Sequence, residues 1–548
     1  MSDLLALVAA MAISMVLIPL MSRVANRLGL VDIPNERKVH ATPVPRVGGI
    51  GIVIGSMVPI MLVLTPDTLI QSYVFGGSVL FIFGLWDDAV EIGHYPKFVG
   101  QIVAALIVVL YGGLYIIRFP FLPGGEISPD MGIPFTIVAI VGMINAMNHS
   151  DGLDGLAGGE SLFSLGAFGL LAFLSPDGAT ALMIVVAVVG GIFGFLRYNT
   201  YPARVFMGDS GSQFIGFTLA FLAIYLTQRV DTSLSPAVVL LLLGLPIADI
   251  LVVLFKRAFN GMNVFRATRN HIHHRLLDLG FVHRESVIII YSLQMIFVTT
   301  GILMRNGDNA VIIATYLGYS VLVFAVINLA EWTGWKLQRT EHHDQSRILA
   351  HEALKNTLVI APRRFLAISI PLFMVSASLF VVKVPKDFAE MSLLVSLLIV
   401  IDLFAGRGHP TTTIMRRALI YVIAAQTGYL WVNYQPVGIP YTEAIETVLL
   451  LLMALAFALA VKFSPRRRKV EFDLTATDYL VAFGVLAVLI TSRDNLWGSG
   501  SVAFVVQMVI IFYACELLIT EKRGGWSWLS VWSMVAGLIL GLRGLFFG

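Results

Sequence analysis

The chain is poor in cysteine and in charge. Its 548 residues include a single cysteine, Cys515, so no disulfide can form within the chain and a thiol mechanism is not favoured. Charged residues make up 13% of the sequence and hydrophobic residues 57%. Soluble proteins carry about 25% charged residues, so lipid is the expected solvent. The net charge of +3 is too small and scattered to indicate a nucleic acid as partner.

Long apolar runs recur along the whole sequence. They reach about 20 residues, the length a helix needs to cross a bilayer. Strands of a membrane barrel would be shorter and would alternate apolar with polar residues. We therefore predict an all-α polytopic membrane protein. Residues 3–20 could pass for a signal peptide, but the basic segment follows this run, so we predict a retained first span.

The runs predict about 18 spans, of which about 11 form a core over residues 1–330 and about seven form a C-terminal transmembrane region over residues 363–548. A polar cytoplasmic linker over residues 331–362 separates them. The predicted core spans lie near 3–22, 47–64, 70–86, 97–117, 132–147, 160–175, 180–196, 212–227, 236–255, 286–304 and 309–330. The C-terminal spans lie near 364–383, 389–404, 415–432, 442–462, 476–491, 500–519 and 526–542.

Lysine and arginine gather in alternate loops, which are 23–46, 256–285 and 463–470. The positive-inside rule places these loops in the cytoplasm and the N-terminus outside. With strict alternation, the loops at 87–96, 148–159 and 197–211 are cytoplasmic as well. The polar motifs described next therefore meet at one face of the membrane.

Two adjacent aspartates, Asp87 and Asp88, close the third predicted span. Carboxylates at a membrane boundary are costly to desolvate, so they need a partner such as Mg²⁺ or a cationic side chain. Lys97 follows nearby in the sequence. A solvated helix cap is the alternative interpretation of the pair.

A more specific pattern follows the fifth predicted span, where Asn145, Asn148, Asp151 and Asp154 recur every three residues among glycines. Amide and carboxylate oxygens on a glycine-rich backbone suit a hard cation or the polar groups of a ribose and a base. An ordinary Gly/Asp turn is the alternative. Such a turn does not need four oxygen-bearing side chains in register.

The eighth predicted span opens with Gly208-Asp209-Ser210-Gly211-Ser212. A helix N-terminus offers free backbone N–H groups to phosphate, and Asp209 beside it can hold a metal that bridges phosphates. A serine N-cap is the competing interpretation.

Histidines cluster at His271, His273 and His274, followed by Arg275. Clustered histidines suggest zinc, but no cysteine and no matching fourth ligand is nearby in the sequence. The surrounding arginines favour a diphosphate as the ligand. The first inner loop, residues 32–49, holds further bases that include Lys38, among proline and glycine. These are either the positive-inside signal or an ordered anion-binding loop.

Together these motifs resemble the polyprenyl-phosphate N-acetylhexosamine-1-phosphate transferase superfamily. The resemblance covers residues 32–276 and keeps the order of the motifs. They are the Arg-Lys-x-His loop with Pro-x-Pro-Arg-x-Gly-Gly, Asp-Asp, Asn-x-x-Asn-x-x-Asp-Gly-Leu-Asp-Gly-Leu-Ala, Met-Gly-Asp-x-Gly-Ser, and His-Ile-His-His-Arg. The last form is similar to that of the branch that uses UDP-GlcNAc or a related UDP-HexNAc.

The resemblance implies transfer of a sugar 1-phosphate from a UDP-N-acetyl sugar to undecaprenyl phosphate, with release of UMP and with Mg²⁺, or Mn²⁺ in its place, as cofactor. It implies that Asp87, Asp88 and Asp209 are catalytic and that Asp209, Asp87 and Asn148 hold the metal. The implied substrate-binding residues are Lys38, Lys97, Asn148, Asp151, Asp154, Ser212, His271, His273, His274 and Arg275. Phosphoryl transfer of this kind relies on charge neutralisation and positioning.

Two departures from the family pattern affect the donor sugar. Ala267-Thr268 stands where the family often has Pro-Asp, and His149-Ser150 stands where apolar or threonine side chains are usual. GlcNAc is the first expectation, while FucNAc, QuiNAc and GalNAc stay open. The product would start a cell-surface glycan such as a cell-wall polymer or lipopolysaccharide O-antigen. The implied lipid indicates the bacterial inner membrane, with the active site facing the cytoplasm.

Two other functions compete with the transferase. A transporter or flippase of lipid-linked sugars would place polar residues near the midplane on two related halves, whereas here they lie at span ends on one side. An inactive scaffold is disfavoured because every acidic motif is intact. The C-terminal region carries no motif, and a homodimer surface or a docking site for a later glycosyltransferase stays open for it.

Overall fold

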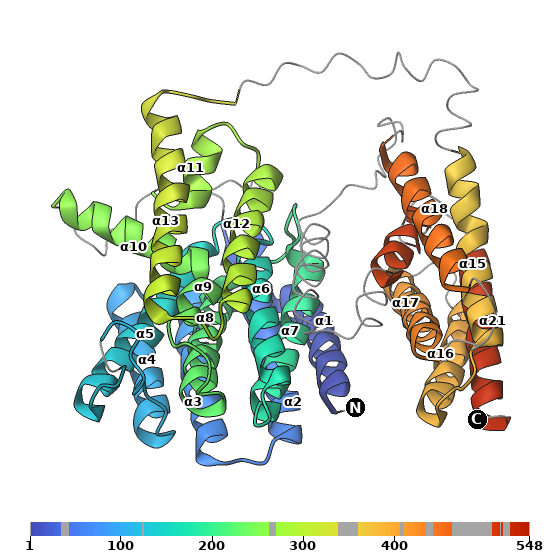
Figure 1. Ribbon diagram of the computed structural model, residues 1–548, viewed down its shortest axis with the longest axis horizontal. Coiled ribbons are helices and arrows are strands. Elements are labelled where there is room, and N and C mark those ends of the chain that lie inside the picture. The colour runs from blue at the N-terminus through green and yellow to red at the C-terminus, as the bar shows by residue number, and fades with distance from the viewer. Residues whose placement is uncertain are drawn as a thin grey trace. The chain divides into compact units, whose positions relative to one another are not determined.

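The computed structural model describes residues 2–33, 43–122, 125–261, 270–337, 360–405, 410–434, 442–462, 507–515, 517–518 and 526–546. These residues are predominantly helical and fall into two compact units, one up to residue 337 and the other from residue 360 (Figure 1). Lys38, most of the predicted linker, the predicted span 476–491 and much of the predicted span 500–519 lie outside the described residues.

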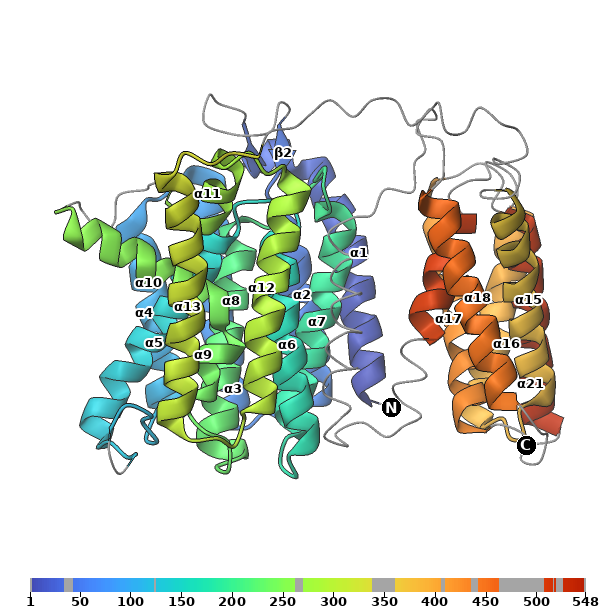
Figure 2. The ribbon, with the colours of Figure 1, turned by 45° about the horizontal axis from the view of Figure 1, so that its top comes forward.

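The first unit is a helical bundle with one small hairpin (Figures 1 and 2). The hairpin pairs β1 (Val31–Asp32) antiparallel with β2 (Val44–Pro45). The helices up to the centre of the bundle are α1 (Ser2–Leu28), α2 (Gly48–Val63), α3 (Thr68–Val90), α4 (His94–Leu106), α5 (Pro129–Ser150), α6 (Leu156–Leu174), α7 (Ala179–Asn199) and α8 (Gly208–Tyr225). The later ones are α9 (Val238–Leu242), α10 (Gly244–Phe259), α11 (Ile272–Asp278), α12 (His283–Leu303) and α13 (Asn309–Trp332), and π-helical turns extend α4 (Ile107–Tyr111) and α8 (Leu226–Val230).

Helix α8 is the centre of this unit, because almost all of its side chains are buried. Its aromatic side chains pack on Tyr73 of α3, whose ring centroid lies 4.9 Å from that of Phe221 and 5.7 Å from that of Phe217. The Tyr73 hydroxyl hydrogen bonds with Thr218 at 3.0 Å, which satisfies a polar group in an apolar interior. Gly216 brings α8 against α5, since a Cβ there would lie 2.7 Å from Ile144 Cα. Close helix packing of this kind is common in membranes.

The chain changes direction between α9 and α10, where the sequence predicts one span over residues 236–255. Helix α9 ends at Leu242, and α10 begins at Gly244 and leaves the bundle at a steep angle to α12 and α13 (Figures 1 and 2). The predicted single span is therefore wrong at this position. Pro246 in the first turn of α10 lacks an N–H and fits the start of a new helix.

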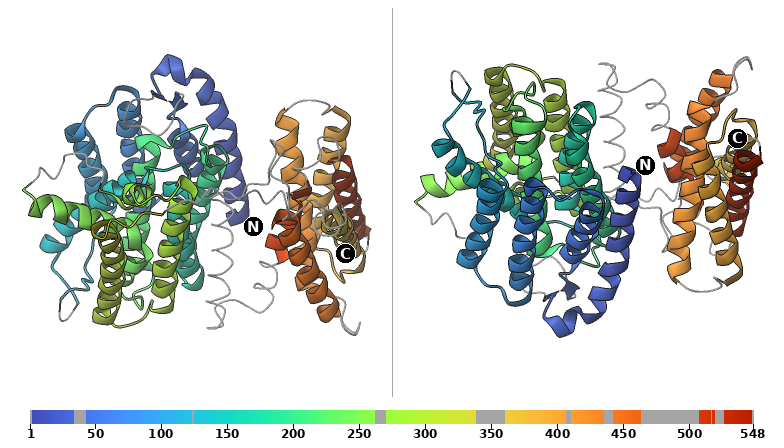
Figure 3. Two further views of the ribbon diagram at one scale, coloured as in Figure 1. Left: turned by 90° about the horizontal axis from the view of Figure 1, so that it is seen from above. Right: turned by 90° about the horizontal axis from the view of Figure 1, so that it is seen from below.

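The second unit consists of the helices α15 (Ala361–Phe380), α16 (Lys386–Ala405), α17 (Pro410–Asn433), α18 (Thr442–Lys462) and α21 (Trp526–Phe546), shown from above and below in Figure 3. Gly537, Gly541 and Gly544 share one face of α21 and lie against α16 and the turn before it. Small residues at this spacing let two membrane helices approach closely. Arg543 donates hydrogen bonds to the carbonyl groups of Ser378, Leu379 and Val381, which end α15.

Eleven helices among the described residues are long and apolar enough to cross a membrane, nine in the first unit and two in the second. Helix α2 and residues 448–457 of α18 are apolar but shorter than the other spans. The predicted all-α polytopic membrane fold is therefore confirmed. The division into about 11 and about seven spans stays a prediction.

Candidate active site

A lysine shared by two aspartates is the first element of the site. Asp87 lies in the last turn of α3, Lys97 in the first turn of α4, and Asp209 in the first turn of α8. The Lys97 ammonium lies 2.6 Å from Asp87 Oδ2 and 2.7 Å from Asp209 Oδ2. Residues predicted from two separate motifs therefore meet at Lys97, although 112 positions separate Lys97 from Asp209.

Asp88 occupies the N-terminus of α8. Its carboxylate accepts hydrogen bonds from the backbone N–H of Asp209 at 2.8 Å, from the N–H of Ser210 at 3.1 Å and from the Ser210 hydroxyl at 2.8 Å. The sequence predicted that the N–H groups at this helix start bind phosphate. Two of them instead donate hydrogen bonds to the Asp88 carboxylate. Gly208 makes this approach possible, because its φ is +74° and a Cβ there would lie 2.5 Å from Asp88 Oδ2. A catalytic role for Asp88 stays a prediction.

Amide side chains complete the surroundings of Asp209. Asn148, at the end of α5, donates from Nδ2 to Asp209 Oδ1 at 3.1 Å and to Ser212 Oγ at 2.9 Å. Gln213 donates to Asp209 Oδ2 at 3.2 Å. The sequence predicted Asn148 and Ser212 but missed Gln213. The four-residue spacing of Asp209 and Gln213 on one helix face could have indicated it.

The loop between α5 and α6 faces the same carboxylates. Asp151 is half-buried, and desolvation by burial, reinforced by the charges of Asp209, Asp88 and Asp154, raises the pKa of its carboxyl to about 7. Asp154 Oδ2 accepts a hydrogen bond from the Ala203 N–H at 2.9 Å, so it connects this loop to the loop before α8.

Asn199 reinforces that connection and was not predicted. Its Oδ1 accepts from the Gly155 N–H at 2.8 Å, and its Nδ2 donates to the Val205 carbonyl at 2.9 Å. Gly155 has a φ of +79°, a conformation that favours glycine. The polar repeat and the Gly-Asp-Ser turn are therefore held in register by a buried asparagine.

The first inner loop contacts the start of α8 through its backbone. Gly48 and Gly49 donate N–H groups to the carbonyls of Phe206 at 3.0 Å and Met207 at 2.8 Å. A Cβ on Gly49 would overlap Gly211. Arg46 pairs with Asp32 and with Glu91, the latter at 3.4 Å. Nothing follows for Lys38, which lies outside the described residues.

The histidines form a set of neighbouring rings. The His271 ring lies 4.7 Å from that of His149 and 6.0 Å from that of His273, and both pairs are stacked. The rings of His273 and His274 are 4.2 Å apart. Burial, with the neighbouring histidine charges, lowers the pKa of His273 well below its usual value, so its imidazole is neutral at pH 7.

Arg275 is engaged in protein contacts. Its guanidinium donates to Glu331 at 2.6 and 2.7 Å and to Asn328 Oδ1 at 2.6 Å, and these contacts tie α11 to α13. The arginine is 4% exposed. The predicted contact of Arg275 with substrate stays a prediction, and the structure gives this side chain an evident role in placing α11.

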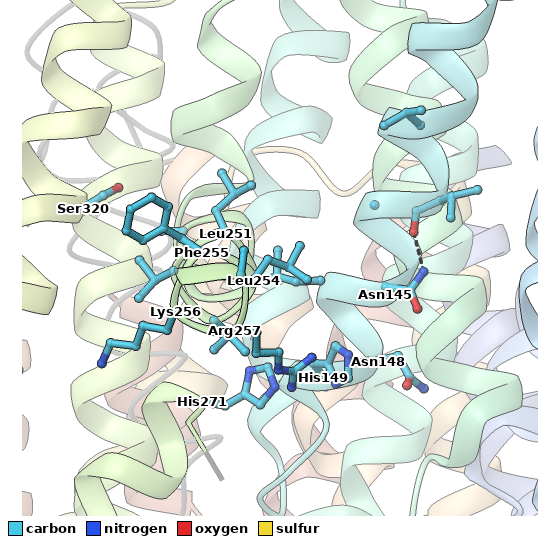
Figure 4. A pocket seen from close by; sticks show the side chains of 18 of the residues that line it. Asn145, Asn148, His149, Leu251, Leu254, Phe255, Lys256, Arg257, His271 and Ser320 are labelled. Carbon is cyan, nitrogen blue, oxygen red and sulfur yellow. Dashed lines mark hydrogen bonds between the residues drawn. The ribbon is translucent and has the colours of Figure 1, made fainter. Parts of the chain in front are cut away.

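An apolar groove of about 1530 Å³ leads to this polar cluster (Figure 4). Its walls are side chains of α4, α5, α10 and α13, including Leu251 and Phe255 of α10. Its lining also includes the polar side chains of Lys97, Asn148, His149, Arg257 and His271, of which the last four gather at one end of the groove in Figure 4. The sequence did not predict the groove, because its walls come from helices far apart in the chain.

The aspartates around Lys97 suit a divalent cation bound together with substrate. No group of three His, Cys, Asp or Glu residues within the described ranges is arranged to hold a metal by itself. Asp87 Oδ1 is buried without a hydrogen-bond partner, and the Lys97 ammonium already marks a position of positive charge between Asp87 and Asp209. Mg²⁺ is commonly held by one or two carboxylates plus substrate phosphates, so this donor set fits.

Comparisons with known proteins agree with this arrangement. The model of glycosyl transferase family 4 matches residues 70–227, which run from α3 through α8. The chain is 31% identical over 322 residues to a probable undecaprenyl-phosphate N-acetylglucosaminyl 1-phosphate transferase of Bacillus subtilis, covering 58% of this chain and 89% of that protein. It is 30% identical to an undecaprenyl-phosphate α-N-acetylglucosaminyl 1-phosphate transferase of Escherichia coli O157:H7, covering 58% and 88%.

A mycobacterial relative extends the set. The decaprenyl-phosphate N-acetylglucosaminephosphotransferase of Mycobacterium leprae is 34% identical over 302 residues, covering 49% of this chain and 75% of that protein. The family match and these relatives identify a glycosyl-1-phosphate transferase, and the fold is that of a multi-pass membrane protein. The chain belongs to the polyprenyl-phosphate N-acetylhexosamine-1-phosphate transferase superfamily.

Proposed function

We propose that this protein transfers N-acetylglucosamine 1-phosphate from UDP-GlcNAc to undecaprenyl phosphate. The observation that carries the proposal is an apolar groove whose lining includes Lys97, the partner of Asp87 and Asp209. Apolar walls suit a lipid chain, and a lysine suits its phosphate. The names of the three relatives indicate the class of reaction. FucNAc, QuiNAc and GalNAc are the alternative sugars.

The reaction exchanges one phosphoanhydride bond for another. An oxygen of the lipid phosphate attacks the β-phosphorus of the UDP-sugar, the bond to the α-phosphate oxygen breaks, and UMP leaves. The product is a lipid-linked diphosphate sugar. Such displacements depend on in-line positioning and on neutralising the phosphate oxygens.

The lipid acceptor is proposed to lie in the groove with its phosphate at the polar end. The walls from α5 and α10 supply apolar contacts for the chain, and Lys97 and Arg257 supply positive charge for the phosphate. Burial of apolar surface contributes about 25 cal/mol per Å², so a long prenyl chain provides most of the acceptor's binding. Asp87 would then orient the phosphate or accept a proton from it.

On the donor side, Asn148, Asp151 and Asp154 are proposed to face the uridine and the sugar, and His271, His273 and His274 the diphosphate. When bound, Mg²⁺ held by Asp87 and Asp209, with Asn148 beside them, would neutralise the phosphate oxygens. Asp88 holds the first turn of α8, which keeps Asp209 in place. A single direct displacement is the proposed mechanism.

The charge pattern of the loops supports a cytoplasmic location for this site, and the implied lipid supports the bacterial inner membrane. The proposed donor is a cytoplasmic UDP-sugar, so the donor and the site would share a compartment. The product would begin a cell-surface polysaccharide.

The proposal is tested by UMP release from the full-length purified protein. The assay supplies undecaprenyl phosphate, Mg²⁺ and one of UDP-GlcNAc, UDP-GalNAc, UDP-FucNAc or UDP-QuiNAc. We expect release with UDP-GlcNAc, loss of release with a chelator, and recovery with Mg²⁺ or Mn²⁺. Asp209→Asn should be inactive, whereas Asp231→Asn, which alters a carboxylate bonded to Ser175 and Ser233, should be active. No release with any donor would refute the proposal.

A further inference from the structure

Asp249 is a buried acid that none of the sequence motifs contains. It lies on α10, is 4% exposed, and has two partners that belong to the histidine motif. Its Oδ2 lies 2.8 Å from His271 Nδ1, and its Oδ1 accepts a hydrogen bond from the Ile272 N–H at 2.9 Å. One carboxylate thus holds both the ring of His271 and the first backbone N–H of α11.

The contact with Asp249 determines which nitrogen of His271 carries the proton. A carboxylate only accepts hydrogen bonds, so the imidazole must donate from Nδ1. In the neutral ring, Nε2 is then the acceptor. The two nitrogens have different tasks, because Nδ1 is held by the protein and Nε2 remains for other partners.

His271 also stacks with two other histidines. Its ring stacks with that of His149 at the end of α5 and with that of His273 of α11. His273 in turn lies directly against Gly152 of the loop between α5 and α6, where a Cβ would overlap the ring. His149 and His271 both line the polar end of the groove (Figure 4). Fixing His271 therefore fixes the relative placement of the motifs that carry these rings.

We propose that Asp249 is a positioning residue for the phosphoryl transfer, which keeps His271 in the tautomer that presents Nε2 at the polar end of the groove. The proposal rests on the proposed function and adds a residue that acts through His271. An acid that fixes the tautomer of a neighbouring histidine is a recurring device in enzymes and metal sites. Asp249 differs from the aspartates around Lys97, because its carboxylate bonds to His271 and to the Ile272 N–H, whereas theirs bond to the lysine.

A purely structural role for Asp249 is the competing explanation, since it also binds the Ile272 N–H. Asparagine separates the two roles. In Asp249→Asn, the amide oxygen can still accept from Ile272, whereas the amide NH₂ donates to His271 Nδ1 and moves the ring proton to Nε2. The start of α11 is kept, but the tautomer is inverted.

The test compares full-length wild type, Asp249→Asn and the matched control Asp231→Asn in the same detergent. The readouts are the thermal unfolding midpoint, kcat and KM for UMP release, and ¹⁵N NMR of protein labelled at histidine, with His271 assigned by its loss in His271→Gln. We expect Asp249→Asn to unfold near the wild-type temperature, to lose about 10-fold or more in kcat, and to show His271 protonated at Nε2. Asp231→Asn should match wild type in kcat and in the His271 signals.

Three results would overturn the proposal. One is wild-type kcat in Asp249→Asn together with an inverted tautomer. Another is a loss of kcat in Asp249→Asn together with a lower unfolding midpoint and an unchanged tautomer, because Asp249 would then only cap α11. The third is a wild-type His271 protonated at Nε2, which decides the question even where the variant does not fold. The tautomer is read without substrate, so a failure of the proposed transferase function is recognised separately by absent UMP release in wild type.

Discussion

Lys97 supplies one positive charge to two carboxylates that come from different helices. The side chains of Asp87 and Lys97 are mostly buried, at 9% and 22% exposure, so water compensates their charges poorly. Breaking a partly buried pair is more costly than breaking an exposed one, because the remaining charge is left uncompensated. The lysine therefore determines whether the aspartates stay close enough to act together.

Replacing Lys97 with methionine should reduce UMP release by about 100-fold or more, the usual scale for loss of a charged group that faces the reacting phosphates. Lys97→Arg keeps the charge but changes the geometry and should recover a part of the activity. Turnover under saturating substrate is the measurement. Lys386→Met, on an exposed turn of α16, is the matched control. Wild-type turnover in Lys97→Met would contradict the assigned role.

The raised pKa of Asp151 predicts that the stability of the fold depends on pH. Its pKa rises from near 4 in the unfolded chain to about 7 in the fold, so the folded state binds more protons between these values. The stability contribution is present below about pH 4 and is lost as the pH rises to about 7. Asp151→Asn should remove this component, which thermal unfolding midpoints from pH 4.5 to 8 would show.

Asp231 provides the contrast for that measurement. Desolvation acts against ionisation there, but hydrogen bonds from Ser233 and Ser175 prevail and lower the pKa of Asp231. Its contribution to stability is present above the unfolded pKa and is lost as the pH falls. Asp231→Asn should therefore leave the decline of stability toward pH 7 in place. The same loss of that decline in both variants would show that Asp151 is not its source.

Sequence patterns predicted the residues of the site that lie in polar motifs, and missed those that stand alone. Asp87, Asp209 and Asn148 could be found because glycine, asparagine and aspartate interrupt apolar runs. Asp249 could not, because it is a single acid in an apolar helix and its partner His271 follows 22 positions later. Contacts of this kind depend on how α10 and α11 pack.

Among the helices, α10 determines the shape of the groove. It exposes Phe255 and Phe259, whose rings stack at 6.2 Å, and its other side carries Asp249 into the interior. Most of the helices were predictable from apolar run length. The break before Gly244 was not, because the apolar run continues through it.

A substitution at Gly142 of α5 tests whether the groove binds the lipid acceptor. Gly142 lines the groove, and a Cβ built there meets no atom within 4 Å, so a side chain can start from this position without a clash. Gly142→Leu should raise KM for undecaprenyl phosphate by about 10-fold, corresponding to about 1.4 kcal/mol of blocked apolar contact. KM for the UDP-sugar should not change. Gly166→Leu, at an equally open position on α6, is the control, and equal effects of both variants would argue against the groove as the acceptor site.

At the level of the whole molecule, the described residues form two units with separate interiors. The predicted site residues that the structure describes all belong to the first unit, and the second is held by its own contacts, among them the three carbonyls that Arg543 binds. The sequence predicted where the first region ends, since the motifs stop and a polar segment follows. It offered no pattern from which a task for the second region could be derived.

Arg543→Met should destabilise the second unit by about 1 kcal/mol, since it removes hydrogen bonds to carbonyl groups that are only partly buried. UMP release should stay at the wild-type rate. Calorimetry and the activity assay on the full chain measure the two effects. Arg305→Met, which removes a similar contact to the Ile302 carbonyl in the first unit, is the reciprocal control. A large loss of turnover in Arg543→Met would mean that the second unit supports catalysis.

The position of the groove between α4, α5, α10 and α13 affects how the reaction rate depends on the amount of lipid. Most of its walls belong to helices long and apolar enough to cross a membrane, so the lipid acceptor of the proposed reaction would reach it from within the leaflet. The effective concentration of that reactant is a mole fraction in the surrounding lipid, whereas the nucleotide sugar is counted in moles per litre. Additional bilayer would then dilute the lipid acceptor and leave the nucleotide sugar unchanged, so the proposed reaction would respond to the composition of the membrane as directly as to the concentration of its soluble substrate.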